Sequence, residues 1–299
     1  MNRSRDYYRK QRARVIRRKQ NIIHSQNDYW HVEHARRKYI MGKLKVCNLS
    51  LEVTRRCNMN CEHCLRGDAQ NMDADLALIP KIFAGIDDID TITFTGGEPA
   101  LNTAYIKAVV DYVIEHKIPV HGCFVATNGK IYSQELVDCV RRLWEKEQSY
   151  GDQFISPVKW VLTHADDEEE YSFFNIAVSG DRYHEDILAA NMLRYYRCGF
   201  FSKMKMQNEK REYILARGRG VSIPGSFDRT ITRLSIEESN DEMAVDEVYV
   251  SCTGAVVTDC DLPYEDIDSG ESVAYLGKVT MKTPLAAILQ KEAEKRRCV

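Results

Sequence analysis

The chain has 299 residues, and its 42 lysines and arginines nearly balance its 44 aspartates and glutamates, for a formal net charge of -2. This balance gives no overall attraction to nucleic acid or membranes, and no apolar run is long enough to span a bilayer. The basic N-terminus lacks the apolar stretch of a secretory signal, so we expect a cytoplasmic protein with no membrane partner. Ten cysteines in a reducing compartment favour metal or cluster ligation over disulfide bonds.

Residues 1–42 form a basic, partly aromatic segment with little apolar periodicity. Arginine, lysine and glutamine are good helix formers, so a helix is compatible with this composition. A charge run of this kind is typical of a solvated arm, which is the interpretation we favour. Binding to nucleic acid or to an acidic peptide stays open as the alternative.

From about residue 47 the sequence alternates between strand-like and helix-like patterns. The expected strands cover residues 49–53, 91–94, 120–126, 173–178 and, with a weaker pattern, 203–207. The expected helices between and after them cover residues 76–84, 103–116, 133–148 and 185–196. Repeated strand–helix units of this size predict a parallel sheet covered by helices. An acidic insertion at about residues 149–170 is expected to be a solvated loop.

After residue 220 this alternation stops. Residues 247–250 and 255–258 are expected to form two strands around a Thr-Gly turn, and residues 284–297 a final helix with proline in its first turn. The predicted organisation is therefore a basic arm (1–42), an α/β domain (43–225) and a small α+β extension (226–299).

Three cysteines directly follow the first expected strand in the sequence Cys57-Asn-Met-Asn-Cys61-Glu-His-Cys64. Thiolates suit iron–sulfur clusters or zinc. Structural zinc usually takes four protein ligands, and His63, adjacent to Cys64, is poorly placed to share one small ion with it. A 4Fe–4S cluster normally takes four cysteines, so three would leave one iron open to another ligand.

The Cys-x3-Cys-x2-Cys spacing on the loop after the first strand resembles that of the radical SAM superfamily. The resemblance implies an α/β fold of the partial (β/α)6 TIM-barrel type, with a 4Fe–4S cluster on Cys57, Cys61 and Cys64. It implies that S-adenosylmethionine chelates the open iron and is cleaved reductively to methionine and a 5′-deoxyadenosyl radical, which abstracts hydrogen from a substrate. It also implies oxygen sensitivity and a reducing partner such as flavodoxin or ferredoxin.

A second motif, Gly96-Gly97-Glu98-Pro99, ends the second expected strand and resembles the family's GGEP motif, which binds the methionine amino group of the cofactor. Two glycines let the backbone approach a ligand closely. The Glu98 carboxylate would face the ammonium group, and Pro99 would stiffen the exit. Active sites of (β/α) barrels lie at this end of the strands.

Four further residues match the family less specifically, and an ordinary turn is the competing interpretation for each. Asn128 ends the third expected strand, where the family places a turn near the cofactor ribose. Ser179 and Asp181 end the fourth strand and resemble a Ser-x-Asp segment, although Gly180 replaces the usual apolar residue. Arg217 resembles a Gly-Arg segment whose guanidinium could bind the cofactor carboxylate bidentately.

The C-terminal extension faintly resembles the SPASM and twitch domains of peptide-modifying members, which implies a peptide or protein substrate. Cys252, Cys260 and Cys298 are available for an auxiliary cluster, but no clear fourth ligand accompanies them, so this question stays open. No residue is indicated as the one that quenches the radical. Two alternatives remain: a zinc-dependent nucleic-acid-binding module, and a radical SAM enzyme whose substrate is RNA.

Overall fold

The computed structural model describes residues 44–148, 174–180, 182–204, 207–208, 211–212, 214–239 and 242–297. The predicted arm, the acidic insertion, Asp181 and Cys298 lie outside the described residues. No helix within the described ranges combines the length and apolar character needed to cross a membrane.

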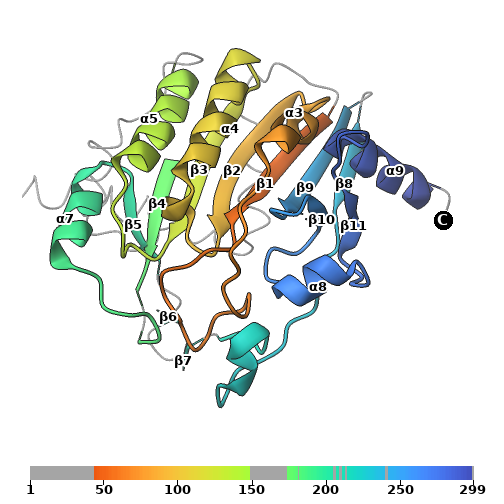
Figure 1. Cartoon of the computed structure of the whole chain (residues 1–299). Coiled ribbons are helices and arrows are strands. Elements are labelled where there is room, and N and C mark those ends of the chain that lie inside the picture. Colours follow the sequence, from red (N-terminus) through yellow and green to blue (C-terminus); the bar gives the residue numbers. More distant parts are fainter. Residues whose placement is uncertain are drawn as a thin grey trace, which may run out of the picture. The chain divides into compact units, whose positions relative to one another are not determined.

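Nine strands of the described chain form one sheet in the order β11-β10-β9-β1-β2-β3-β4-β5, with β8 paired to β9 (Figure 1). Their bounds are β1 Leu44–Thr54, β2 Asp88–Gly96, β3 Val120–Thr127, β4 Phe174–Ser179, β5 Phe201–Met204, β8 Ile236–Ser239, β9 Glu242–Val250, β10 Ala255–Val257 and β11 Tyr275–Lys278. All pairs from β9 through β1 to β5 are parallel, whereas β8, β10 and β11 pair antiparallel. A separate two-stranded hairpin joins β6 (Gln207–Asn208) to β7 (Arg211–Glu212).

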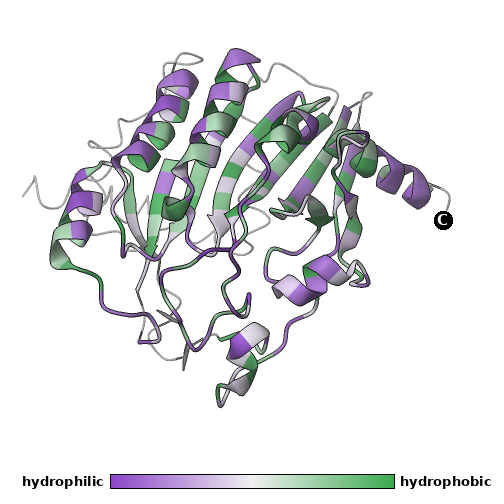
Figure 2. Cartoon of the chain, viewed as in Figure 1, coloured by the Kyte–Doolittle hydropathy of each residue, from purple (hydrophilic) through white to green (hydrophobic). Residues whose placement is uncertain are grey.

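Helices cover the sheet as the apolar periodicity predicts. Their bounds are α3 Ile79–Phe83, α4 Thr103–Glu115, α5 Gln134–Gln148, α7 Ala189–Arg197, α8 Tyr264–Ser269 and α9 Leu285–Arg297, with 3-10 turns η1 Leu76–Leu78, η2 Pro99–Leu101 and η3 Gly218–Ser222. Figure 1 shows α3, α4 and α5 side by side along one face of the sheet, and Figure 2 shows apolar residues along the strands behind them.

Helix α4 shows how local sequence sets this packing. Its N-cap Asn102 accepts a hydrogen bond from the Tyr105 amide at 3.3 Å, which satisfies one of the unpaired donors of the first turn. Ile106, Val109 and Val113 recur at helical spacing and are fully buried. The prediction of an α/β protein with a mostly parallel sheet is confirmed, while the finer geometry of a partial six-unit barrel stays a prediction.

The C-terminal part of the chain continues the same sheet. Strand β9 pairs in parallel with β1, in a register that runs from Leu44 opposite Met243 to Leu51 opposite Val250. Strand β1 therefore lies between β2 and β9. The loop that follows β1 thus lies near residues from both the N-terminal and the C-terminal halves of the sequence. The division into domains at residue 225 stays a prediction, and the sheet runs across it without a break.

Candidate functional site

The three clustered cysteines lie on a loop that leaves the carboxyl end of β1 and returns to it. At the neck of this loop, the Arg55 amide donates to the Met72 carbonyl at 2.8 Å, and the Gln70 amide donates to the Arg55 carbonyl at 3.0 Å. Within the loop, the Cys64 amide donates to the Cys61 carbonyl at 3.2 Å. Cys57, Cys61 and Cys64 are each half-buried. We call residues 56–69 the cysteine loop.

The spread of the three thiols bears on which metal group they suit. Two groups of three potential ligands among the described residues have all their ligand atoms within 4.8 Å of one another, and the loop cysteines are not one of them. Zinc bonded to sulfur at about 2.3 Å would bring the sulfurs to about 3.8 Å apart. At least one pair of the three loop sulfurs therefore lies farther apart than 4.8 Å, which is wider than the spacing around a bound zinc ion.

The glycines of the Gly-Gly-Glu-Pro turn are required by the chain's own backbone. Gly96 has a φ of +137°, and a Cβ there would lie 2.2 Å from the Thr54 carbonyl oxygen. A Cβ on Gly97 would lie 2.3 Å from the Arg56 carbonyl oxygen. The Gly97 amide donates to Thr54 and the Glu98 amide donates to Arg56, each at 2.8 Å. The turn and the start of the cysteine loop are thus one hydrogen-bonded unit.

Glu98 is fully buried and joins the ends of β2 and β3. Its Oε1 accepts from the Thr127 hydroxyl at 2.7 Å and from the Ala100 amide at 2.9 Å, and its Oε2 accepts from the Asn128 amide at 2.7 Å. Burial raises the pKa of Glu98, while these three donors act to lower it. Pro99 begins η2. The Glu98 carboxylate already accepts these internal hydrogen bonds. Its binding of a ligand's ammonium group therefore stays a prediction.

Asn128 reaches the cysteine loop from the end of β3. Its Nδ2 donates to the Asn58 side-chain oxygen at 2.9 Å and lies 3.8 Å from the Cys57 sulfur. Lys130, which sequence reasoning passed over, donates to the Asn58 carbonyl at 3.0 Å and pairs with Glu185. The available signal for Lys130 was its position directly after the Thr-Asn-Gly turn.

The remaining predicted cofactor residues have different placements. Ser179 ends β4 and is half-buried, and Asp181 lies outside the described residues. The Arg217 guanidinium is buried and donates to the Asp261 carbonyl at 2.8 Å and the Arg229 carbonyl at 2.9 Å. Arg217 thus bonds to the C-terminal segment, and its predicted contact with the cofactor carboxylate stays a prediction.

Arg219, two residues further on, bonds to the cysteine loop. Its amide donates to the Cys64 carbonyl at 2.9 Å, and its guanidinium bonds to the Asn60 side chain. Gly218 adopts a φ of +52°, and a Cβ there would lie 2.4 Å from the Leu65 carbonyl oxygen. The Gly-Arg-Gly turn therefore packs directly against the cysteine loop.

An open hollow of about 560 Å³ lies beside the cysteine loop. It is lined by Glu62, Arg182, Tyr183, Arg219, Ser222, Ile223 and Pro224. The His63 ring packs near it, with its centroid 5.2 Å from that of Tyr183. The volume is within the range of small-molecule sites, and Glu62, which stands next to Cys61 in the sequence, places part of the cysteine loop on the wall of the hollow.

The other cysteines fall into two groups. Cys123 and Cys139 are buried core thiols, as expected, and Cys47 is half-buried. Burial raises the pKa of Cys252, with Glu52 adding to the effect, and burial raises that of Cys260, with Glu247 adding to it. Acidic neighbours disfavour the thiolate form that a cluster needs, and an auxiliary cluster stays an open question.

Comparison with known proteins gives a family match at this site. The model of the 4Fe-4S single cluster domain matches residues 47–145, from β1 through α5. The uncharacterised Methanocaldococcus jannaschii protein MJ0907 is 30% identical over 100 residues, which are 32% of this chain and 35% of that protein. Bacillus subtilis YfkA is 35% identical over 79 residues, 24% of this chain and 20% of that protein. The alignments thus span about a third and a fifth of these relatives.

Solved structures show a looser likeness. The anSMEcpe structure with bound AdoMet and Cp18Cys peptide has a TM-score of 0.38 at 11% identity, covering 83% of this chain and 80% of that one. Streptococcus suis SuiB bound to S-adenosylmethionine has a TM-score of 0.38 at 10% identity, covering 89% and 72%. Similarity at this level supports no inference about the chemistry of this chain.

The family match and the geometry point to the same part of the chain. The matched residues include both the cysteine loop and the Gly-Gly-Glu-Pro turn, which the structure joins at one end of the sheet. Residues 47–145 are therefore similar to a 4Fe-4S single cluster domain. The activity of a radical SAM enzyme and the use of S-adenosylmethionine stay predictions.

Proposed function

We propose that Cys57, Cys61 and Cys64 are the cluster ligands of this chain. When bound, the cluster would supply the electron that cleaves S-adenosylmethionine to methionine and a 5′-deoxyadenosyl radical, which abstracts hydrogen from the substrate. The observation that supports this most directly is the set of three half-buried thiols on one short loop, a ligand set that leaves one iron of a 4Fe–4S cluster open. Structural zinc usually takes four protein ligands, so a set of three thiols also disfavours the alternative of a zinc-dependent nucleic-acid-binding module.

The surrounding residues take supporting roles in this proposal. The Asn128 amide, 3.8 Å from the Cys57 sulfur, would donate to that sulfur and so tune the reduction potential. Gly96 and Gly97 hold the turn against the loop, Glu98 and Pro99 fix its shape, and Ser179 and Asp181 stay the proposed contacts at the end of β4. Arg219 joins Arg217 as a proposed contact of the cofactor carboxylate, because its amide and guanidinium bond to the cysteine loop.

A peptide or protein is the proposed substrate class, from the resemblance of the C-terminal extension. The hollow lined by Glu62 and Arg219 offers room for a substrate group beside the cysteine loop. Flavodoxin or ferredoxin is the proposed electron donor. RNA is the second candidate substrate, and deleting residues 1–42 tests it, since RNA affinity should then fall and its salt dependence weaken.

The central test is reconstitution with iron and sulfide in the absence of oxygen. The wild-type chain is expected to hold about four iron atoms and to release 5′-deoxyadenosine with dithionite. Cys61→Ala should abolish iron binding, whereas the matched control Cys139→Ala, in a buried thiol of α5, should retain it. A well-folded, iron-loaded wild-type sample that releases no 5′-deoxyadenosine would contradict the proposal, and so would stoichiometric zinc in protein purified without oxygen.

A further inference from the structure

Two arginines flank the three-cysteine motif, residues 57–64, symmetrically in the sequence. Arg55 stands two residues before Cys57, and Arg66 stands two residues after Cys64. Both guanidinium groups are buried against residues 249–268, which run from the end of β9 through β10 to α8. We call residues 249–268 the clasp segment. The proposed function gives this segment no role.

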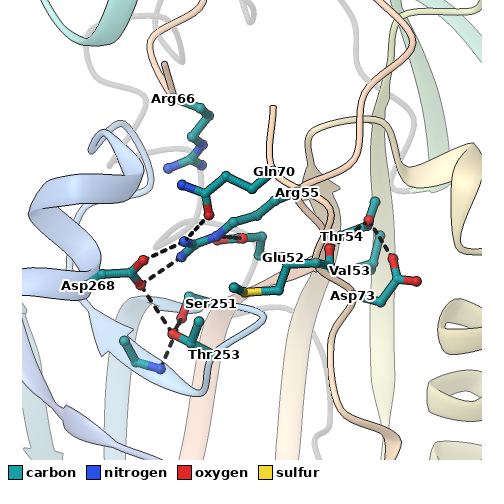
Figure 3. A network of polar contacts seen from close by, with 12 residues as sticks. Glu52, Val53, Thr54, Arg55, Arg66, Gln70, Asp73, Ser251, Thr253 and Asp268 are labelled. Atoms are coloured by element: carbon teal, nitrogen blue, oxygen red, sulfur yellow. Dashed lines mark hydrogen bonds and ion pairs between the residues drawn. The ribbon is translucent and has the colours of Figure 1, made fainter. Parts of the chain in front are cut away.

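Arg55 is held by two carboxylates, one side-chain amide and one aromatic ring. Its side chain is fully buried, and its Nε donates to Glu52 Oε1 at 2.6 Å. Its two terminal nitrogens donate to the Asp268 carboxylate at 2.6 and 2.9 Å (Figure 3). Nη1 also donates to Gln70 Oε1 at 2.9 Å, on the returning end of the cysteine loop. The Tyr264 ring lies 4.4 Å from the guanidinium carbon. One side chain thus links β1, the neck of the cysteine loop and α8.

Arg66 enters the clasp segment at the other end of the loop. Its Nη1 donates to the Leu262 carbonyl at 2.7 Å, and its guanidinium carbon lies 4.6 Å from the centroid of the Tyr249 ring. Its main-chain carbonyl accepts from the Tyr264 amide at 3.2 Å. The Tyr249 hydroxyl donates to Glu52 Oε2 at 2.7 Å, so Glu52 contacts both Arg55 and the ring under Arg66.

The cost of burying charge makes this arrangement restrictive. Removing the carboxylate partner of a buried guanidinium strongly destabilises a fold. The Arg55 side chain is therefore restricted to the position in which it pairs with Asp268. The two arginines are separated by the eight-residue segment from Cys57 to Cys64 and one further residue on each side. Contacts on Arg55 and Arg66 therefore restrict the distance between the two ends of that segment, and with it the placement of Cys57 and Cys64.

We propose that the clasp segment positions the cysteine loop, with Arg55 and Arg66 as positioning residues and Asp268 as the side chain that locks Arg55. The relevance to the cluster rests on the proposed function, because it requires Cys57 and Cys64 to be ligands. The competing interpretation is a joint that merely adds to the stability of the fold. The two interpretations predict different results when the Arg55–Asp268 contact is weakened. A positioning role predicts a loss of protection in the cysteine loop alone, whereas a purely stabilising role predicts a loss spread over the sheet.

The test uses Asp268→Asn in the full chain, which keeps the shape of the side chain and removes its charge. The matched control is Asp266→Asn, an exposed acid on the same helix. In iron-free protein, amide hydrogen exchange of peptides within residues 56–69 should become about fivefold faster in Asp268→Asn, a charged hydrogen-bond effect reduced by the partial exposure of Asp268. Exchange in α4 should stay unchanged, and Asp268→Glu should restore most of the protection.

In iron-loaded protein the same variant should lose iron to a chelator faster, and its electron paramagnetic resonance spectrum should respond differently to S-adenosylmethionine. Equal acceleration of exchange in the loop and in α4, or no acceleration in either, would overturn the positioning role. Faster exchange confined to the loop of a wild-type-like fold that binds no iron would leave the positioning role standing and overturn the proposed function instead.

Discussion

Both ends of the sheet gather reactive side chains, but their neighbours differ. At the amino ends of the strands, Asp88, Asp90 and His121 bring potential metal ligands within 4.8 Å of one another. Lys45 lies there too, with its Nζ 2.9 Å from Asp90 Oδ1, and His121 contacts both Asp88 at 3.1 Å and Glu147 at 2.9 Å. The carboxylates at this end of the sheet are therefore paired with cationic side chains of the protein itself.

At the carboxyl ends, by contrast, the thiols are soft ligands on a loop secured at its ends. Main-chain bonds close the neck of the loop, and guanidinium groups hold its two flanks. The sulfurs themselves stay half-buried. Proximity of metal-ligand residue types is thus insufficient to identify a metal site. What distinguishes the two ends is whether the protein itself supplies the compensating positive charge.

Replacing Lys45 would break the amino-end network most severely. In Lys45→Met, Asp88 and Asp90 lose their buried cation, and the free energy of unfolding should fall by about 3 kcal/mol. Iron content after reconstitution should stay at the wild-type level, because the cysteine loop lies at the opposite end of the strands. Urea unfolding and an iron assay check both parts, with Lys107→Met as an exposed-lysine control. Loss of iron from a folded Lys45→Met sample would contradict the separation of the two ends.

The pH dependence of stability probes the same network with a smaller effect. Burial lowers the pKa of His121, but the hydrogen bonds to Asp88 and Glu147 outweigh it, and the net pKa is raised to about 9. Because the folded pKa exceeds the unfolded value of about 6.5, this stabilisation is complete below pH 6.5 and is lost as the pH rises through 9. The loss should be at most about 3 kcal/mol.

His121→Gln isolates this contribution. Burial lowers the pKa of nearby Lys146 to about 8, so it titrates in an overlapping range with the opposite sign, and the useful quantity is the difference between wild type and variant. That difference in unfolding free energy should be large at pH 6 and shrink toward pH 10. A difference that is constant with pH would show that folding does not raise the pKa of His121.

Much of the fold could be predicted because it depends on local patterns. Alternating apolar residues marked β1, and the spacing of Ile106, Val109 and Val113 marked the buried side of α4, so both elements were found where expected. The cysteine spacing likewise indicated a cluster loop without tertiary information. The short elements β8, α8 and β11 were missed, since a few residues carry too little periodicity to be recognised.

The contacts across the sheet could not be predicted in this way. Nothing local to Arg55 indicates Asp268, which is 213 residues away and reaches it only because β9 pairs with β1. Arg217 and Arg219 pose a similar problem, since each follows or precedes a glycine in the same short segment. The positive φ of Gly218 and its close packing on the Leu65 carbonyl decide which of the two arginines contacts the loop.

At the carboxyl end, Gly97→Ala should have a moderate effect on stability and a large effect on the site. Its Cβ would lie 2.3 Å from the Arg56 carbonyl oxygen, so the turn and the start of the cysteine loop must move apart. Overpacking of this kind costs about 2 kcal/mol. The measurement is iron content and thermal unfolding of the same sample, with Gly67→Ala, where a Cβ meets nothing within 4 Å, as the control for positive-φ strain without a clash. Equal iron retention in both variants would contradict the coupling of turn and loop.

Arg219→Ala should have the smallest effect on stability. Its main effect should be on cofactor binding at the site. Its ion pair with Asp68 spans 3.3 Å and involves an almost fully exposed carboxylate, so its loss should change the free energy of unfolding by less than about 1 kcal/mol. The matched control is Arg141→Ala, which removes a comparable surface pair with Asp138 on α5. Both variants should unfold alike, whereas only Arg219→Ala should weaken S-adenosylmethionine binding to the iron-loaded protein, by about threefold. Weakened binding in both variants, or in neither, would remove Arg219 from the site and leave the Gly-Arg-Gly turn with its backbone contact to Cys64 alone.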